Sequence, residues 1–372
     1  MRLIVVGSGV VGAACAYTAA GLGAQVTLVD AAEPGQATAA GAGIICPWTS
    51  AVDDPAWYEF GCAAAREYPD LVAQLAEHDE PDVSYRRVGA LWLPPGDDDD
   101  GTALIATAGR LAARRAGAPE IGEVEILDPG QAAGLFPPLR PDAAAVHIAG
   151  AARVDGRRLA AALIRAAVRR GAQVRTGRAV LEHRTGRVHA IGIDGEQLLA
   201  DAVVAATGAW TRSFLAPAGI TVRVEPQRGQ IAHIGVEPAD TSRWPVVLPS
   251  ATGHYLLAFD DSRVVAGATR ETGAGFDVRV TPAGLAEVLA NALAVAPGLS
   301  DGTLLQTRVG LRPAGPDHRP QLGPVAALEG LVVATGLGAS GLTLGPLTGR
   351  IAAQVALGQP PGFDLAPFDP LR

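Results

Sequence analysis

The stretch Leu3-Ile-Val-Val-Gly-Ser-Gly-Val-Val-Gly12 joins a short apolar run to glycines spaced as G-x-G-x-x-G. The run predicts a strand that is buried on both faces, and the alanine-rich residues 13–22 predict the helix that follows. Gly7 permits a tight turn, Gly9 lets the backbone approach a pyrophosphate, and Gly12 lets the helix pack closely on the strand. Free N–H groups at the helix N-terminus favour phosphate there. The stretch therefore predicts the first unit of a dinucleotide-binding fold.

An acidic residue closes the next predicted strand, residues 25–29. Asp30 lies 18 residues beyond Gly12, where a carboxylate accepts hydrogen bonds from the ribose of a bound dinucleotide. A carboxylate at this place disfavours a 2′-phosphate and therefore NADP. The alternative interpretation is a glycine turn that binds no ligand.

Two later segments also end a buried strand with glycine. Thr207-Gly208 follows the apolar residues 203–206, and Gly336 to Gly341 follow residues 331–334. The small residues 35–44, just after the acidic strand end, would let a second flat group approach the backbone. Three such segments meeting at one edge of a sheet would fit one extended cofactor, which favours FAD over NAD. Three ordinary strand-to-helix turns are the alternative.

Composition excludes several classes of protein. The chain has 372 residues, enough for two or three domains, and its 48% apolar and 18% charged residues argue against disorder. Its formal net charge of −8 disfavours nucleic acid as a partner. Lysine is absent, which excludes P-loop NTPases and enzymes that form a Schiff base through lysine. The histidines show no metal-ligand spacing, so we expect no metal site.

The cysteines and the apolar runs indicate where in the cell the protein is expected. Cys15, Cys46 and Cys62 form no CxxC pair, as is typical of a protein from a reducing cytosol. No uninterrupted apolar run reaches the roughly 18 residues that span a bilayer, and the predicted strand at 3–6 leaves no room for a signal peptide. We expect a cytoplasmic protein without a membrane span. The aspartates 97–100 are interpreted as a solvated loop, and the oligomeric state is left open, with a homo-oligomer as one option.

With these motifs in place, the sequence resembles the FAD-dependent D-amino-acid oxidase family, and the order and spacing of its motifs look closest to glycine oxidase. The resemblance covers nearly the whole chain. Besides the N-terminal motif and Asp30, it is carried by segments distributed along the sequence: Ala42-Gly43-Ile44, Ala206-Thr-Gly-Ala-Trp210, Gln227-Arg-Gly-Gln230, His254-Tyr255, Val265-Ala-Gly-Ala-Thr269, Gly310-Leu-Arg-Pro313 and Gly336 to Gly341.

The resemblance implies an α/β fold (α+β overall), in which a Rossmann-like FAD-binding domain is interleaved with a mainly antiparallel β substrate domain. We expect residues 1–85, 145–222 and 308–372 to form the FAD-binding domain, and residues 86–144 and 223–307 to form the substrate domain. Sarcosine oxidases share this fold but carry a flavin-linked cysteine in the C-terminal third and a lysine beside flavin N5. The last cysteine here is Cys62 and lysine is absent, so a non-covalent FAD is expected.

The resemblance also implies which residues bind FAD. Val180, in a predicted hairpin, corresponds to the valine that lies near adenine in the family. The full expected set is Gly7, Gly9, Val10, Val11, Gly12, Asp30, Ala31, Thr38, Ala42, Gly43, Ile44, Val180, Thr207, Gly208, Trp210, Gly338, Ala339, Ser340, Gly341, Leu342 and Thr343.

Three side chains are expected at the substrate. The arginine of the family's G-L-R-P segment binds the substrate carboxylate and corresponds to Arg312, and Tyr255 corresponds to the tyrosine that contacts the same group. Arg270 stands where family members more often have a neutral residue. It is interpreted either as a second cation for a longer substrate or as a solvated or ion-paired side chain at a strand end, near Glu271. The alternatives for Arg312 and Tyr255 are a structural ion pair and a core aromatic residue with a satisfied hydroxyl.

Together these features predict an FAD-dependent amine or amino-acid oxidase. The expected substrate is glycine, a small D-amino acid or an N-substituted glycine, with O2 as the expected electron acceptor. Hydride leaves the α carbon for flavin N5, and the imine is hydrolysed to an oxo-acid such as glyoxylate plus an amine or ammonia. Two alternatives stay open: a D-amino-acid dehydrogenase of the same fold that uses a quinone or another carrier, and a flavin-binding protein without turnover.

Overall fold

The glycine turn lies at the carboxyl edge of a six-stranded sheet in the computed structural model, which describes residues 1–80, 82–96 and 101–372. The strands, in spatial order, are β20 (Gln321–Pro324), β21 (Leu331–Thr335), β13 (Ala202–Ala205), β1 (Arg2–Val6), β2 (Gln25–Asp30) and β9 (Gln173–Thr176). All neighbours run parallel except β20, which is antiparallel to β21. The short apolar runs of the sequence form its central strands, as burial on both faces requires.

Helices pack against this sheet and against one another through small residues. They are α1 (Val10–Gly21), α3 (Pro55–Glu77), α6 (Gly156–Arg169) and α9 (Gly341–Ala356). A Cβ on Gly12 would overlap the carbonyl oxygen of Gly7, and one on Gly349 of α9 would overlap that of Val11. Asp155 caps α6, because its Oδ1 accepts from the first backbone N–H groups of the helix.

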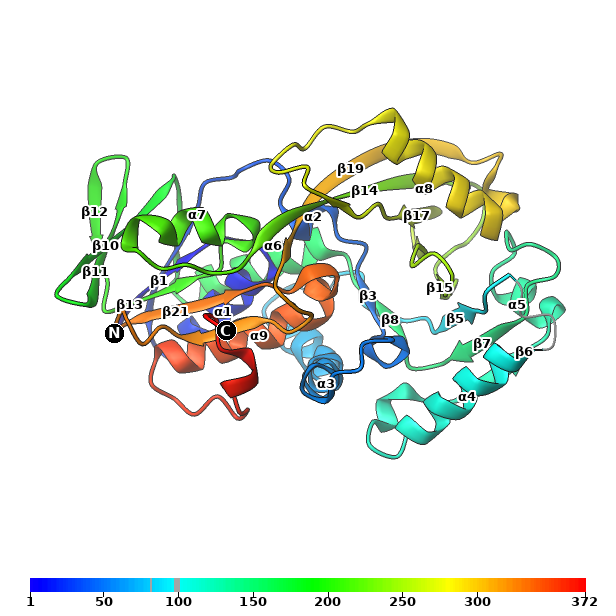
Figure 1. The fold of residues 1–372 in the computed structure, drawn as a ribbon, viewed down its shortest axis with the longest axis horizontal. Coiled ribbons are helices and arrows are strands. Elements are labelled where there is room, and N and C mark those ends of the chain that lie inside the picture. Colours follow the sequence, from blue (N-terminus) through cyan, green and yellow to red (C-terminus); the bar gives the residue numbers. More distant parts are fainter. Residues whose placement is uncertain (81, 97–100) are drawn as a thin grey trace.

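A second, nine-stranded sheet forms the other part of the molecule (Figure 1). Its strands are β18 (Glu271–Thr272), β14 (Glu225–Gly235), β17 (Arg263–Gly267), β16 (Tyr255–Phe259), β15 (Val246–Pro249), β5 (Ala90–Leu93), β7 (Ala145–Ile148) and β6 (Val124–Leu127), with β19 (Thr303–Ala314) paired to β14. Its pairs are antiparallel except β15 with β5. The associated helices are α4 (Thr102–Arg114), α5 (Pro129–Leu135) and α8 (Pro282–Val295).

Two small sheets complete the architecture. One contains β10 (Ala179–Arg184), β11 (Arg187–Ile193) and β12 (Glu196–Leu199) and lies at one end of the molecule (Figure 1). The other contains β3 (Ile44–Ile45), β8 (Ala152–Arg153) and β4 (Arg86–Arg87). The short helices α2 (Ala37–Ala40) and α7 (Thr211–Leu215) lie near the long strands β14 and β19 (Figure 1).

The alternation of residues 85–95 predicts a single strand, but in the structure this segment forms two strands that belong to different sheets. β4 pairs with β8, whereas β5 pairs with β7 and β15. Between them the chain bends at Gly89, which has a φ of +77°, and the N–H groups of Val88 and Gly89 both donate to the carbonyl of Ala151. Alternation alone does not distinguish one strand from two strands joined by a glycine bend.

Both large sheets take strands from separate stretches of the sequence, which confirms the predicted interleaved α/β fold with a mainly antiparallel second sheet. The exact division of the chain into two domains stays a prediction. β7 and the end of β19 lie in the nine-stranded sheet, next to the proposed boundaries at 145 and 308. The aspartates 97–100 lie outside the described residues. None of the helices in the described ranges has both the length and the apolar character needed to cross a bilayer.

An ion-pair cluster joins the end of α3 to α6 and provides a test of stability. The carboxylate of Glu80, whose residue is only 8% exposed, pairs with Arg165 and Arg169. Hydrogen bonds from Arg165 and then Arg169 lower the pKa of Glu80 from 4.5 to about 2, although burial opposes them. The stabilisation is therefore present above pH 4.5 and is lost as the pH falls through about 2.

We expect Glu80→Gln to lower the free energy of unfolding at pH 7 by about 1–2 kcal/mol. The effect is limited because both arginines remain accessible to solvent, which screens the ion pairs. The difference from wild type should shrink as the pH falls from 4.5 towards 2. Urea unfolding at several pH values measures it, with Asp70→Asn, an exposed change on α3, as the control. A difference that stays constant across this pH range would contradict the ion-pair explanation.

Candidate functional site

A cavity of about 420 Å³ follows the carboxyl ends of β1, β2, β13 and β21 and extends to the nine-stranded sheet. Most residues expected to bind the cofactor line it: Gly7, Gly9, Val10, Val11, Asp30, Ala31, Thr38, Ala42, Gly43, Ile44, Val180, Thr207, Gly208, Trp210, Gly338, Ala339, Gly341 and Leu342. Arg312, Tyr255 and Arg270 line the same cavity. The fold thus brings the predicted segments, which are far apart in sequence, to one place.

Three residues of the predicted set do not lie in the cavity wall. Gly12 lies under the glycine turn, where it allows α1 to approach Gly7. Thr343 donates from its hydroxyl to the carbonyl oxygen of Ile44 at 2.9 Å and so holds a segment that does line the cavity. Ser340 ends the short turn Gly338–Ser340 before α9. In this structure the three contribute to packing and placement.

The glycine turn forms one side of the cavity. Gly7 has a φ of +103°, and a Cβ there would overlap the carbonyl of Ala206, so no other residue fits without strain. The N–H of Val10 donates to the hydroxyl of Thr38 at 3.0 Å, which ties the turn to the small-residue segment. The first N–H groups of α1 lack partners within the helix, and its positive dipole end faces this side of the cavity.

The carboxylate of Asp30 is already bound by three donors of the protein. Oδ2 accepts from the N–H of Ser8 at 2.6 Å, and Oδ1 accepts from the N–H of Ala32 at 2.6 Å and from the amide of Gln36 at 3.0 Å. A carboxylate has about four acceptor positions. Asp30 therefore stabilises the glycine turn and keeps room for one further donor from a ligand.

The far end of the cavity contains side chains that the sequence reasoning missed. Val180, of which 52% is exposed, lines the cavity there. Glu33 and Arg178 also line the wall and form an ion pair with each other. Arg178 stands two residues before Val180, so the neighbourhood of the predicted residue was the signal available in the sequence. The ion pair joins the end of β2 to the start of β10.

Arg312 projects from β19 and Tyr255 from the first position of β16 into the other end of the cavity. Both depend on glycine neighbours. A Cβ on Gly229 would lie 2.6 Å from the terminal nitrogens of Arg312, and one on Gly267 would overlap the Tyr255 ring. Glycines in β14 and β17 therefore make the space that these two side chains occupy.

The alternatives for Arg312 and Tyr255 are a structural ion pair and a core aromatic residue with a satisfied hydroxyl, and Tyr255 does pack against the main core. Arg312 donates to the carbonyl oxygen of Thr269 at 2.9 Å but pairs with no carboxylate among the described residues. The Tyr255 hydroxyl likewise forms no hydrogen bond with any of the described residues. Burial raises the pKa of Tyr255 and lowers that of Arg312, and the positive charge of Arg270 lowers the latter further. A neutral phenol and an uncompensated guanidinium thus face the cavity together.

Arg270 forms no ion pair with Glu271, but the residue is exposed, in agreement with the solvated interpretation. Glu271 pairs instead with Arg228, whose Nε and terminal nitrogen lie 3.0 and 2.6 Å from its Oε2. Arg270 donates to the carbonyl oxygen of Gly253 at 3.0 Å and has no carboxylate partner within the described ranges. Its guanidinium lines the cavity beside Arg312.

Glu271 also organises the backbone on which this site is built. Its Oε1 accepts from the amide of Gln230 and from the hydroxyl of Thr269, both at 2.7 Å. Thr269 in turn provides the carbonyl that receives Arg312. The side chain of Glu271 therefore holds the segment that carries Arg270 and orients Arg312.

Apolar residues also line the cavity. Ile231 and Leu311 line the cavity next to predicted motifs and were not anticipated individually. The Trp210 ring lies against Phe276, with the ring centroids 5.5 Å apart. This lining suits a flat apolar group on one side and a small anionic molecule beyond it.

Comparisons with known proteins agree with this geometry. A family model described as "DAO: FAD dependent oxidoreductase" matches residues 2–355. One similar solved structure is the crystal structure of iminodiacetate oxidase from Chelativorans sp. BNC1. The two sequences are 47% identical, the TM-score is 0.95, and 99% of each chain is covered. It is 46% identical to the uncharacterised oxidoreductase YurR of Bacillus subtilis, over 99% of this chain and 98% of the relative. A glycine oxidase of Pseudomonas aeruginosa is 32% identical, over 99% and 98%.

Proposed function

Since the chain belongs to the DAO family of FAD-dependent oxidoreductases, we propose that it oxidises an N-substituted glycine carrying a second carboxylate, with FAD bound non-covalently. Two hydrogens leave the substrate, one as hydride from the α carbon and one as a proton from the nitrogen. Water then adds to the imine carbon, and cleavage of the C–N bond gives glyoxylate and an amine. For iminodiacetate the released amine would be glycine.

The residues of the cavity fit FAD. The glycine turn and the α1 N-terminus would hold the pyrophosphate, Asp30 the ribose, and the wall around Val180 the adenine. The small residues 42–44 and 338–342 would lie along the isoalloxazine. When bound, FAD supplies the acceptor for the substrate hydride. Cys15, Cys46 and Cys62 are buried and absent from the wall, which supports non-covalent binding.

The observation that carries the proposal is the pair of guanidiniums at one end of the cavity. Arg312 would bind the carboxylate next to the reacting carbon through a two-point fork, and the Tyr255 hydroxyl would donate to the same group. Arg270, which has no described carboxylate partner, would bind the second carboxylate. One cation suffices for glycine, so a second free cation supports a dicarboxylate. The 47% identity to an iminodiacetate oxidase supports the same substrate class.

These side chains act by binding and orientation. Arg312 and Arg270 at the two ends of a dicarboxylate would fix its long axis and thereby aim one methylene at the flavin side of the cavity. Ile231 and Leu311 would exclude water from the reacting carbon. No carboxylate or histidine lines the substrate end within the described residues. The nitrogen proton is therefore expected to leave to solvent.

An absorption spectrum tests the proposal. The purified protein is expected to be yellow, to release its flavin on denaturation, and to be bleached anaerobically by iminodiacetate at far lower concentration than by glycine. Stopped-flow reoxidation with O2 then tests whether oxygen is the electron acceptor. Equal bleaching by glycine and iminodiacetate would contradict the dicarboxylate, and flavin that stays attached after denaturation would contradict non-covalent binding.

Replacing Asp30 with alanine is expected to weaken FAD binding by about 10- to 100-fold, because a charge-assisted hydrogen bond contributes about 1.5–3 kcal/mol. The change also removes the acceptor of the Ser8 N–H. Asp30→Asn is the matched control, since it keeps one oxygen for that donor and should retain more flavin. Flavin fluorescence released on dilution is the measurement. Unchanged retention in Asp30→Ala would show that this carboxylate does not bind the ribose.

A further inference from the structure

A second, much smaller cavity shares Thr38, Gly41 and Ala42 with the wall of the large one. Its volume is about 10 Å³, which is room for one water molecule or one monatomic ion. The residues that complete its wall include one histidine, three arginines and one aspartate: His233, Arg157, Arg263, Arg308 and Asp155. Nothing in the proposed reaction uses this cluster.

His233 presents an unpartnered N–H to this cavity. The residue is 1% exposed, and its Nδ1 lies 2.8 Å from a terminal nitrogen of Arg263. A guanidinium can only donate, so Nδ1 must accept, and the neutral ring then carries its hydrogen on Nε2. Burial and the positive charges of Arg308, Arg263 and Arg157 lower the pKa of His233 to about 3, so the ring stays neutral. Nε2 is buried and has no partner among the described residues.

Two of the arginines, Arg308 and the solvent-exposed Arg157, form no direct ion pair among the described residues. Arg308 donates to the carbonyl oxygen of Ala39 at 3.4 Å and to the amide oxygen of Gln306 at 3.3 Å, and Arg157 donates to Ala39 at 2.9 Å. Neither forms an ion pair with a carboxylate in the described part of the chain. Burial and the like charges of Arg157 and Arg263 lower the pKa of Arg308 to about 10.

The nearby carboxylates of Asp155 and Asp261 have partners of their own. One oxygen of Asp155 accepts from the N-terminus of α6, and the other lies 3.8 Å from Arg263. Asp261 pairs with the Nε of Arg263 at 3.1 Å. Asp155 and Asp261 also act on Arg308, where they partly oppose the lowering of its pKa. Two nearby carboxylates thus face three arginines, which leaves one positive charge uncompensated.

We propose that this cavity binds one chloride-sized anion, which accepts from Nε2–H of His233 and lies beside the guanidiniums of Arg308 and Arg157. An anion is favoured over water because Nε2–H of His233 is an unpartnered buried donor and the arginines outnumber the nearby carboxylates, whereas a water molecule must also donate two hydrogens. The bound anion would hold the two arginines that fix the Ala39 carbonyl. It would thereby stabilise α2 and the adjoining wall of the cofactor cavity.

Anion binding can be measured directly on the FAD-loaded protein. Crystals soaked in sodium bromide are expected to show an anomalous peak within hydrogen-bonding distance of Nε2 of His233. In solution, the ³⁵Cl resonance should broaden in a saturable way. At constant ionic strength, replacing gluconate by chloride should raise the thermal midpoint by about 2–4 °C.

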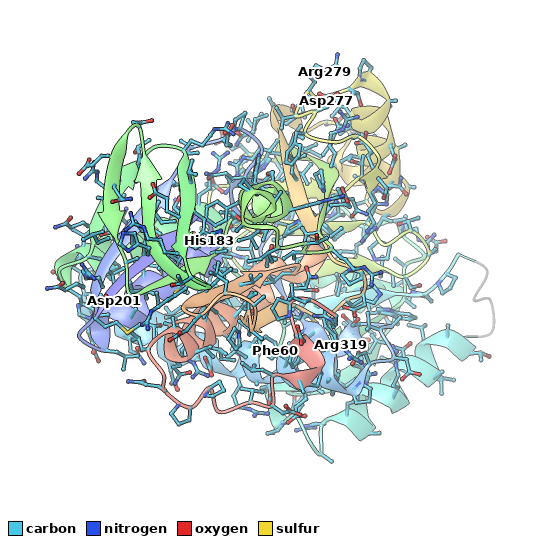
Figure 2. All side chains as sticks on the ribbon, turned by 60° about the vertical axis from the view of Figure 1, so that its left-hand side comes forward. Phe60, His183, Asp201, Asp277, Arg279 and Arg319 are labelled. Carbon is cyan, nitrogen blue, oxygen red and sulfur yellow. The ribbon has the colours of Figure 1, made fainter. Side chains whose placement is uncertain are left out.

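Variants separate this site from general salt effects. His233→Leu removes the donor, and Arg308→Met removes one cation at a partly exposed position, so that a folded variant remains if the first fails to fold. Both should abolish the difference between chloride and gluconate. His183→Leu, on the exposed hairpin strand β10 (Figure 2), and Arg184→Met are the matched controls and should keep it. A water peak without anomalous signal, together with equal midpoints in the two salts, would overturn the proposal.

Discussion

Arg312→Ala is expected to raise the KM for every carboxylate-bearing substrate by about 10- to 100-fold or more. The substrate carboxylate would lose a charge-assisted hydrogen-bonded fork, which contributes about 1.5–3 kcal/mol. Arg312 pairs with no described carboxylate, and its hydrogen bond goes to the carbonyl oxygen of Thr269, so its positive charge is left for the substrate carboxylate. The measurement is steady-state kinetics with iminodiacetate and with glycine.

The two controls address charge and structure separately. Arg312→Lys keeps the positive charge but loses the planar fork, so it should restore the KM only in part. Arg279→Ala removes a guanidinium at an outer tip of the molecule, where it pairs with Asp277 (Figure 2), and should leave the kinetics unchanged. Wild-type apparent affinity in a folded, yellow Arg312→Ala variant would refute the proposed role.

Arg270→Ala is expected to lower kcat/KM for iminodiacetate by about 10- to 100-fold while changing that for glycine by less than about threefold. Only the longer substrate loses a contact, because glycine has no second carboxylate. The substrate preference should therefore move towards glycine. The measurement is kcat/KM for glycine, a small D-amino acid and iminodiacetate in wild type and variant.

A conservative change strengthens this test. Arg270→Lys retains a cation near the second carboxylate and should keep much of the preference for iminodiacetate. Glu271→Gln is the complementary variant, since it weakens the hold on Thr269 and Gln230 without removing a cation. It should raise the KM for all three substrates together. Equal losses for all substrates in Arg270→Ala, or none, would place its guanidinium outside the substrate site.

The first βαβ unit could be predicted from sequence because its determinants are local. The strand, the glycine turn and the acidic strand end all lie within residues 2–30, and Gly12 meets Gly7 within the same turn. The interleaved fold could be predicted because the order of the motifs along the chain resembles that of a known family. The prediction of a single strand over 85–95 was wrong, because the bend at Gly89 depends on the distant carbonyl of Ala151.

By itself the sequence determined the fold class, the cofactor and the residue types that line its cavity, since these rest on local turns and on motif order. Only the tertiary structure decided which partner each arginine pairs with. Glu271 is adjacent to Arg270 in the chain, yet it pairs with Arg228 because β14 and β18 lie side by side. In the same way, the pairing of β14 with β17 and β19 brings His233 near Arg263 and Arg308. A charge takes whichever partner the packing brings within a few ångströms, and adjacency in sequence does not reveal that partner.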